Sequence, residues 1–80
     1  MAREQTRAQA LGVKTGRLLG ASARKLQRAE ALIAEVSAMF CDVDGGMEQD
    51  AEAMVREIEK LRVEGLAAAR EALSEPWGGY

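Results

Sequence analysis

The chain of 80 residues has no histidine, only one cysteine and only one proline. Without histidine it lacks the commonest general base and the commonest transition-metal ligand. Cys41 has no second cysteine with which to form an intrachain disulfide. No nucleophile is spaced with a base in a recognisable catalytic pattern. The composition therefore predicts a protein that is not an enzyme and that holds neither a metal nor a cofactor.

Long apolar runs are absent as well. No stretch approaches the roughly 20 apolar residues that cross a bilayer, and the first residues, MAREQTRAQALG, have no apolar segment typical of a signal peptide. A lone thiol suits a reducing compartment. We therefore expect a cytoplasmic protein that does not bind membranes.

Charge is present but unevenly distributed. Residues 1–29 hold seven basic groups and one acidic group, whereas residues 30–80 hold four basic and twelve acidic groups, which gives the net charge of −2. The basic groups of the first segment are Arg3, Arg7, Lys14, Arg17, Arg24, Lys25 and Arg28. This asymmetry predicts either pairing between the two halves or a basic surface for an anionic partner.

A seven-residue repeat dominates the first half of the chain. Leu19, Leu26, Ile33 and Phe40 recur every seven residues, smaller residues follow each of them by three positions, and Leu32 and Met39 widen the apolar stripe. This spacing is typical of an amphipathic helix with coiled-coil packing. The segment CDVDGG, residues 41–46, interrupts the pattern, and a second apolar stripe begins at Met47 and continues to Leu73.

The segment 41–46 resembles a calcium loop only superficially. Counted from Asp42, the fifth, sixth and twelfth positions of an EF-hand would be Gly46, Met47 and Ala53, and none of these fits the pattern. A tight turn with an aspartate cap on the following helix needs none of these positions.

These patterns predict an all-α fold, an antiparallel hairpin of two helices. We expect the first helix at about 3–41, a turn at 42–46, the second helix at about 47–74 and a tail at 75–80, all in one domain. Residues whose numbers sum to about 88 would then face each other. That register predicts the ion pairs Arg17–Glu71, Arg24–Glu64 and Arg28–Glu59. A two-helix hairpin is rarely stable alone, so we expect dimerisation to a four-helix bundle.

The stretch GVKTGRLLG, residues 12–20, places three glycines four residues apart. Each glycine costs about 1 kcal/mol relative to alanine in a helix interior. One explanation is close helix packing on this face; the alternative is that residues 1–16 are frayed or form a separate short helix. The predicted assembly face comprises Leu11, Gly12, Gly16, Leu18, Leu19, Gly20, Leu26 and Ile33.

The function predicted from these features is a small protein-binding module, such as an adaptor, inhibitor or chaperone-like regulator. Trp77 and Tyr80 are candidate anchors for a partner protein, with Arg3 and Arg7 as steering charges. Trp77 folding back over the thin end of the hairpin is an equal alternative. A structural coiled-coil segment without its own activity is a further reading.

A nucleic-acid binder is the alternative function. Its phosphate contacts would be Arg3, Arg7, Lys14, Arg17, Arg24 and Lys25. No aromatic side chain lies among these residues to stack on bases, and the chain's pI is near 5. Charge pairing within the hairpin is therefore the favoured explanation of the basic half.

Overall fold

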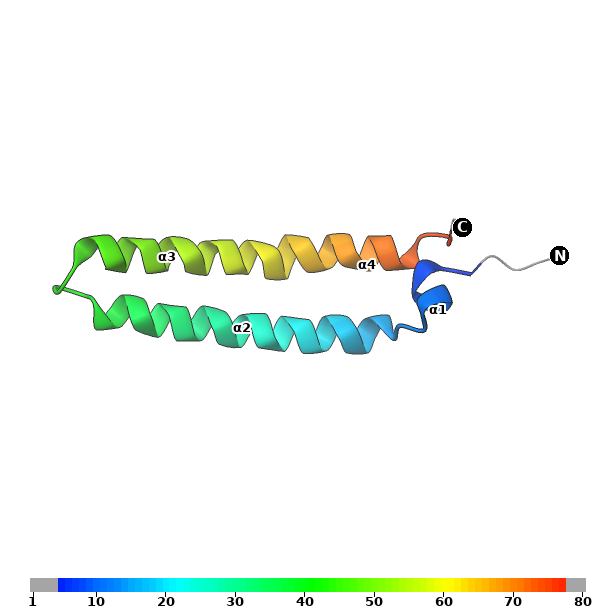
Figure 1. The fold of residues 1–80 in the computed structure, drawn as a ribbon, viewed down its shortest axis with the longest axis horizontal. Coiled ribbons are helices and arrows are strands. Elements are labelled where there is room, and N and C mark those ends of the chain that lie inside the picture. The colour runs from blue at the N-terminus through cyan, green and yellow to red at the C-terminus, as the bar shows by residue number, and fades with distance from the viewer. Residues whose placement is uncertain (1–4, 78–80) are drawn as a thin grey trace.

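The computed structural model describes residues 5–77, and the described part is built from one short helix and two long helical rods. The elements are α1 (Arg7–Leu11), α2 (Thr15–Met39), α3 (Gly45–Lys60), the π-helical turn η1 (Leu61–Gly65) and α4 (Leu66–Ser74). The last three continue without a break and run antiparallel to α2 (Figure 1). The predicted all-α hairpin is therefore confirmed.

Asp44 organises the turn between the rods. Its carboxylate accepts hydrogen bonds from the backbone N–H groups of Gly46 (2.9 Å) and Met47 (3.2 Å), and so caps α3. The carbonyl of Phe40 accepts the N–H groups of Val43 and Asp44, which closes the end of α2. Gly45 and Gly46 consequently belong to the first turn of α3, and the turn lies two residues earlier than predicted.

The prediction of one helix over residues 3–41 is wrong within the described residues, because the chain breaks after α1. Thr6 and Gln9 form a capping box at the start of α1. Gly12 ends the helix with a left-handed backbone (φ +69°), and the N–H of Val13 donates to the carbonyl of Ala8. The alternative of a separate short helix is the correct one.

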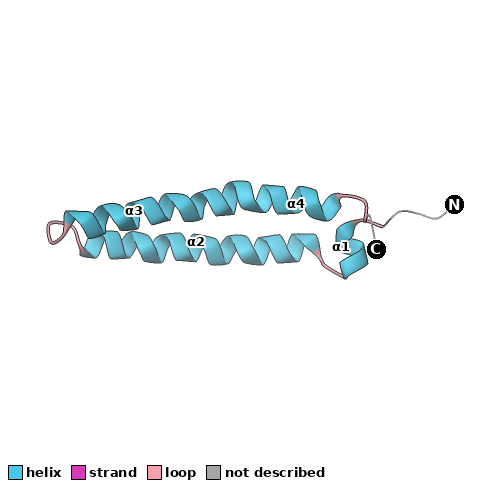
Figure 2. Ribbon diagram, turned by 45° about the horizontal axis from the view of Figure 1, so that its top comes forward, coloured by secondary structure: helices cyan, strands magenta, loops and turns pink. Residues whose placement is uncertain are grey.

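The open end of the hairpin is closed by the two ends of the described chain. Thr6 and Pro76 form an isolated antiparallel bridge. The N–H of Arg7 donates to the carbonyl of Glu75 (2.9 Å), and the N–H of Trp77 donates to that of Gln5 (2.7 Å). Both ribbon views show α1 folded across this end beside α4 (Figures 1 and 2). Residues 5–14 therefore turn back across the end of the hairpin beside the second rod.

The core of this rod-shaped molecule is thin. The structure measures 66 × 18 × 17 Å with a radius of gyration of 18.0 Å, whereas a compact chain of this length has about 11.6 Å. Among the described residues, the buried positions are only Ala8, Leu19, Ser37 and Ala51. One layer of contacts between two helices thus leaves most apolar side chains partly in water.

The helix register follows from neighbours across the hairpin. Ser37 bonds to Glu48 (numbers that sum to 85) and Gly20 shares a hollow with Ala67 (sum 87). Facing residues therefore have numbers that sum to about 86, close to the predicted value of 88.

Candidate interaction surface

One side of the hairpin carries the polar contacts between the rods, and we call it the polar side. Ser37 Oγ donates to the backbone carbonyl of Glu48 (3.2 Å). Arg62 donates through Nε to Glu30 Oε2 (2.6 Å) and through Nη2 to Oε1 (3.3 Å), with both side chains mostly shielded. This hydrogen bond, reinforced by the charge of Glu30, raises the pKa of Arg62 above its ordinary value. The polar side therefore fixes the register of the two rods.

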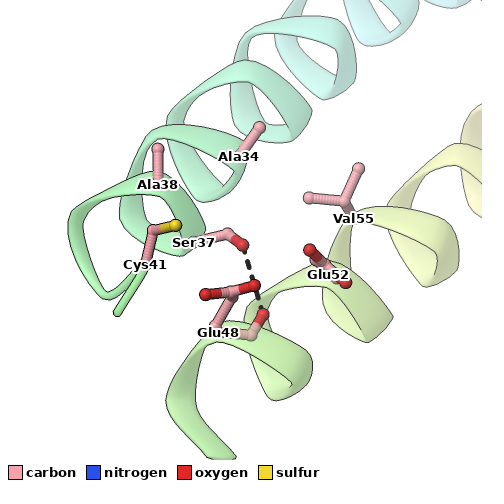
Figure 3. Close-up of a pocket in the computed structure, with 7 residues that line it drawn as sticks. All are labelled: Ala34, Ser37, Ala38, Cys41, Glu48, Glu52 and Val55. Carbon is pink, nitrogen blue, oxygen red and sulfur yellow. Dashed lines mark hydrogen bonds between the residues drawn. The ribbon is translucent and has the colours of Figure 1, made fainter. Parts of the chain in front are cut away.

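A shallow hollow lies on the polar side near the turn. Figure 3 shows small side chains of α2 facing glutamates and a valine of α3 across it. The lining residues are Ala34, Ser37, Ala38, Cys41, Glu48, Glu52 and Val55. No group of side chains within residues 5–77 is arranged to hold a metal ion. The hollow is open to solvent, and among its described lining residues the hydrogen bond across it is the one from Ser37 to Glu48.

The opposite side of the hairpin is apolar. On α2, Leu18, Leu32 and Met39 are separated by multiples of seven residues, with Lys25 in the same row. On the second rod, Met47, Met54 and Leu61 repeat every seven residues. We call these six apolar residues the apolar face.

Helix geometry places both rows on the same side. On α2, the row of Leu18 precedes the seam residue Leu19 by one position, whereas the row of Glu30 and Ser37 follows seam residues by four, so these two rows flank the seam on opposite sides. In an antiparallel pair, a two-fold axis perpendicular to the hairpin keeps equivalent rows on one side. The row of Glu30 and Ser37 meets the second rod on the polar side. The row of Leu18 on α2 and the row of Met47 on the second rod therefore lie together on the opposite side of the hairpin.

The register aligns the two rows as rungs. At a sum of 86, Met39 lies opposite Met47, and Leu32 lies opposite Met54. Lys25 lies at the level of Leu61 and is the one charged interruption. The six apolar residues are 40% to 72% exposed. The structure thus presents a ladder of large apolar side chains to solvent along most of the hairpin.

The residues of the predicted assembly face divide between the inside and the outside of the hairpin. Leu19 is buried, and Leu26 and Ile33 are half-buried in the seam between the rods. Leu11 and Leu18 are exposed. Only these last two side chains are therefore available to a partner.

The predicted close approach at the glycines is absent within the hairpin. A Cβ atom built on Gly16 meets no atom within 4 Å, and one on Gly20 meets only the guanidinium of Arg24 at 3.5 Å. Gly12 serves the end of α1 instead. Gly16 and Gly20 thus line one open hollow beside the second rod and are not packed closely against it, so the three glycines do not form one packing surface between the rods.

The structure describes two of the four predicted partner-binding residues, Arg7 and Trp77. Arg3 and Tyr80 lie outside the described residues. Arg7 opens α1, and its side chain is exposed. Trp77 is half-buried, with its backbone bonded to Gln5, which fits the alternative in which the tail folds back over the end of the hairpin.

The basic residues do not form the predicted ion pairs. Within residues 5–77 the salt bridge is Glu30–Arg62, so the pairs expected for Arg17, Arg24 and Arg28 are not formed. Lys14 and Lys25 are exposed, as are these arginines. Arg24, Lys25 and Arg28 line a shallow surface depression together with Ala21. The basic half is thus open to solvent instead of being neutralised by the acidic half.

Comparison of the chain with protein-family models, curated proteins and solved structures gave no match. Within the described part, no helix combines the length and the apolar character needed to cross a bilayer. The functional argument therefore depends on the surfaces of the hairpin itself.

Proposed function

We propose that this chain is a non-enzymatic protein-binding module of the cytoplasm, acting as an adaptor, inhibitor or chaperone-like regulator through helix packing. The observation that carries this proposal is the apolar face, which is contributed by both rods and open to solvent. A hairpin that presents such a face gives a partner helix a matching groove between two rows of side chains. Catalysis has no comparable support, because no pair of nucleophile and base is in contact among residues 5–77.

The energy available at this face is large enough for binding. The exposed fractions of its six side chains together equal about three fully exposed side chains. Covering them is worth roughly 5–9 kcal/mol, at about 1.5–3 kcal/mol for each fully buried side chain. Association costs at least about 4 kcal/mol in lost freedom. A partner that covers the whole face therefore gains net affinity, whereas one that covers a third of it does not.

The test is a capture experiment with a matched control. The tagged protein and the variant Leu32→Glu/Met54→Glu, which places two charges on one rung of the apolar face, are used in parallel on nuclease-treated lysate of the source cells. The control variant Gln27→Glu/Ala53→Glu adds the same charge at exposed positions outside the face. We expect proteins that bind to wild type and control and are lost from the face variant. Identical captured proteins for all three would refute the proposal.

A second candidate function is nucleic-acid binding, and the exposed, unpaired cluster of Arg24, Lys25 and Arg28 favours it. With Arg17 these groups offer about four phosphate contacts, so duplex DNA affinity is expected to fall about a hundredfold between 50 and 200 mM salt. Fluorescence anisotropy with labelled DNA and RNA measures this dependence. Absence of binding at 50 mM salt, or equal binding by Arg24→Gln/Arg28→Gln, would remove this candidate.

A further inference from the structure

We infer that the apolar face is covered by a second copy of this chain, with the two hairpins face to face and both turns at the same end. The product is a four-helix bundle with two-fold symmetry about its long axis. This inference rests on the proposed function, because it names the first partner of the same apolar face. It differs from the assembly predicted from sequence, which used the glycine segment and the seam residues.

The shape of the face suits a second hairpin. Its rungs run from Met39 and Met47 beside the turn to Leu18 at the far end of α2, about 32 Å along the long axis at 1.5 Å per residue. A partner that covers all of these rungs must be straight over that length. A second copy has that length and presents an equal row of apolar side chains.

The solvent-exposed area of the chain is larger than that of a compact protein of the same mass. The whole chain, ends included, exposes 6303 Å². A compact protein of its 8.6 kDa mass is expected to expose about 4,700 Å². A standard interface removes about 800 Å² from each partner. The chain as a whole therefore exposes enough area for an interface of that size.

Charges along the edges of the apolar face select the orientation. The residue three positions after each face residue lies beside it on the outer edge. On the α2 edge this position holds Arg28, next to Lys25 within the face. On the edge of the second rod it holds Glu57 and Glu64 at the same level. All four side chains are exposed, so at mid-length the α2 edge is basic, and the edge of the second rod carries two acids with Lys60 beside them.

Only one face-to-face arrangement brings opposite charges together. With both turns at the same end, α2 of one copy lies beside the second rod of the other, and Lys25 and Arg28 meet the partner copy's Glu57 and Glu64. With the turns at opposite ends, each edge meets its own kind, and like charges oppose each other. Glu35, Asp42 and Asp50 near the turn are the exception, since all three are acidic. The mid-length charges outnumber them and favour the same-end arrangement.

Mass and affinity test the second copy. Sedimentation equilibrium of the purified full chain should give twice the 8.6 kDa mass of one chain. Leu32→Glu/Met54→Glu should weaken the dimer at least a hundredfold, and the control Gln27→Glu/Ala53→Glu should change it less than about threefold. Circular dichroism of each variant checks that helix is retained. A wild-type monomer at 100 µM would overturn the inference, as would equal weakening by both variants.

The single native cysteine tests the orientation without any substitution. Cys41 is exposed beside the turn. Spin labels on it should be roughly 20–35 Å apart across the bundle if the turns share an end, from two helix layers about 10 Å apart plus the labels. With the turns at opposite ends, the two cysteines would lie about 40 Å apart along the axis before the labels are added, because each is about 14 residues from the middle of α2 at 1.5 Å per residue. A distance of about 40 Å or more overturns the same-end arrangement. A wild-type monomer that still captures a protein through the apolar face would refute the second copy while supporting the proposed function.

Discussion

Alanine at two of the glycines should change stability in opposite directions. Gly20 lies inside α2 with helical geometry, and a Cβ atom there meets only the guanidinium of Arg24, at an ordinary contact distance of 3.5 Å. Gly12 has φ +69°, a backbone conformation that side chains with a Cβ atom disfavour. Gly20→Ala is therefore expected to stabilise the protein and Gly12→Ala to destabilise it.

The two magnitudes follow from backbone preferences. Alanine in place of an interior helical glycine gains about 0.5–1 kcal/mol, because the unfolded chain loses less freedom on folding. Alanine in the left-handed region costs about 1–2 kcal/mol. For a chain of this size, 1 kcal/mol corresponds to about 4–8 °C in the midpoint of thermal unfolding. The two variants should thus differ from each other by about 6 °C or more.

Thermal unfolding followed by circular dichroism measures both shifts, at one fixed chain concentration because association makes the midpoint concentration-dependent. Gly16→Ala serves as a control, since a Cβ atom there meets nothing within 4 Å and the residue lies in the first turn of α2. Its shift should be small and upward. Destabilisation by Gly20→Ala together with loss of the dimer would refute this reasoning and restore the close glycine packing predicted from sequence.

Three further substitutions test the turn and the polar side. Asp44→Ala should cost about 1 kcal/mol in urea unfolding because it removes the cap of α3, and Asp44→Asn should recover most of it; equal losses would refute capping. Arg62→Gln should lower the urea midpoint because it removes the ion pair, and a double-mutant cycle with Glu30→Gln should show coupling. Zero coupling would reduce the pair to a surface contact. Ser37→Ala should cost about 1 kcal/mol in the same assay, and an unchanged midpoint would show that its bond to Glu48 contributes nothing.

Most of the hairpin is predictable from the sequence because its signals are local. The repeat of Leu19, Leu26 and Ile33 specifies α2, and Asp44 with two following glycines specifies the turn. The sequence does not decide whether Gly12 lies in a closely packed helix or ends a separate short helix, because a glycine at helical spacing does not reveal the sign of its φ angle.

The closure of the open end and the ion pairs were not predictable in the same way. The bridge between Thr6 and Pro76 joins residues 70 positions apart and depends on where the two rods end. The expected ion pairs assumed that facing charges on the outer edges touch. The salt bridge that forms is Glu30–Arg62, whose numbers sum to 92, because long side chains beside the seam reach along the rods.

The apolar face was visible in the sequence as the widening of the α2 stripe by Leu32 and Met39, but its meaning depends on how many neighbours the helix has. A helix with one neighbour buries a single stripe, and the row of Leu19 already fills the seam with the second rod. The adjacent row therefore lies beyond the reach of that rod, and its side chains remain 47% to 72% exposed. Because the second rod carries an equivalent row on the same side, each rod has room for one further neighbour, in the same direction. Two neighbours per helix, placed at the two flanks of one stripe, is the geometry of a four-helix bundle. The width of the apolar stripe thus leaves room for the proposed second copy, and the edge charges of Lys25 and Glu57 bear only on its direction.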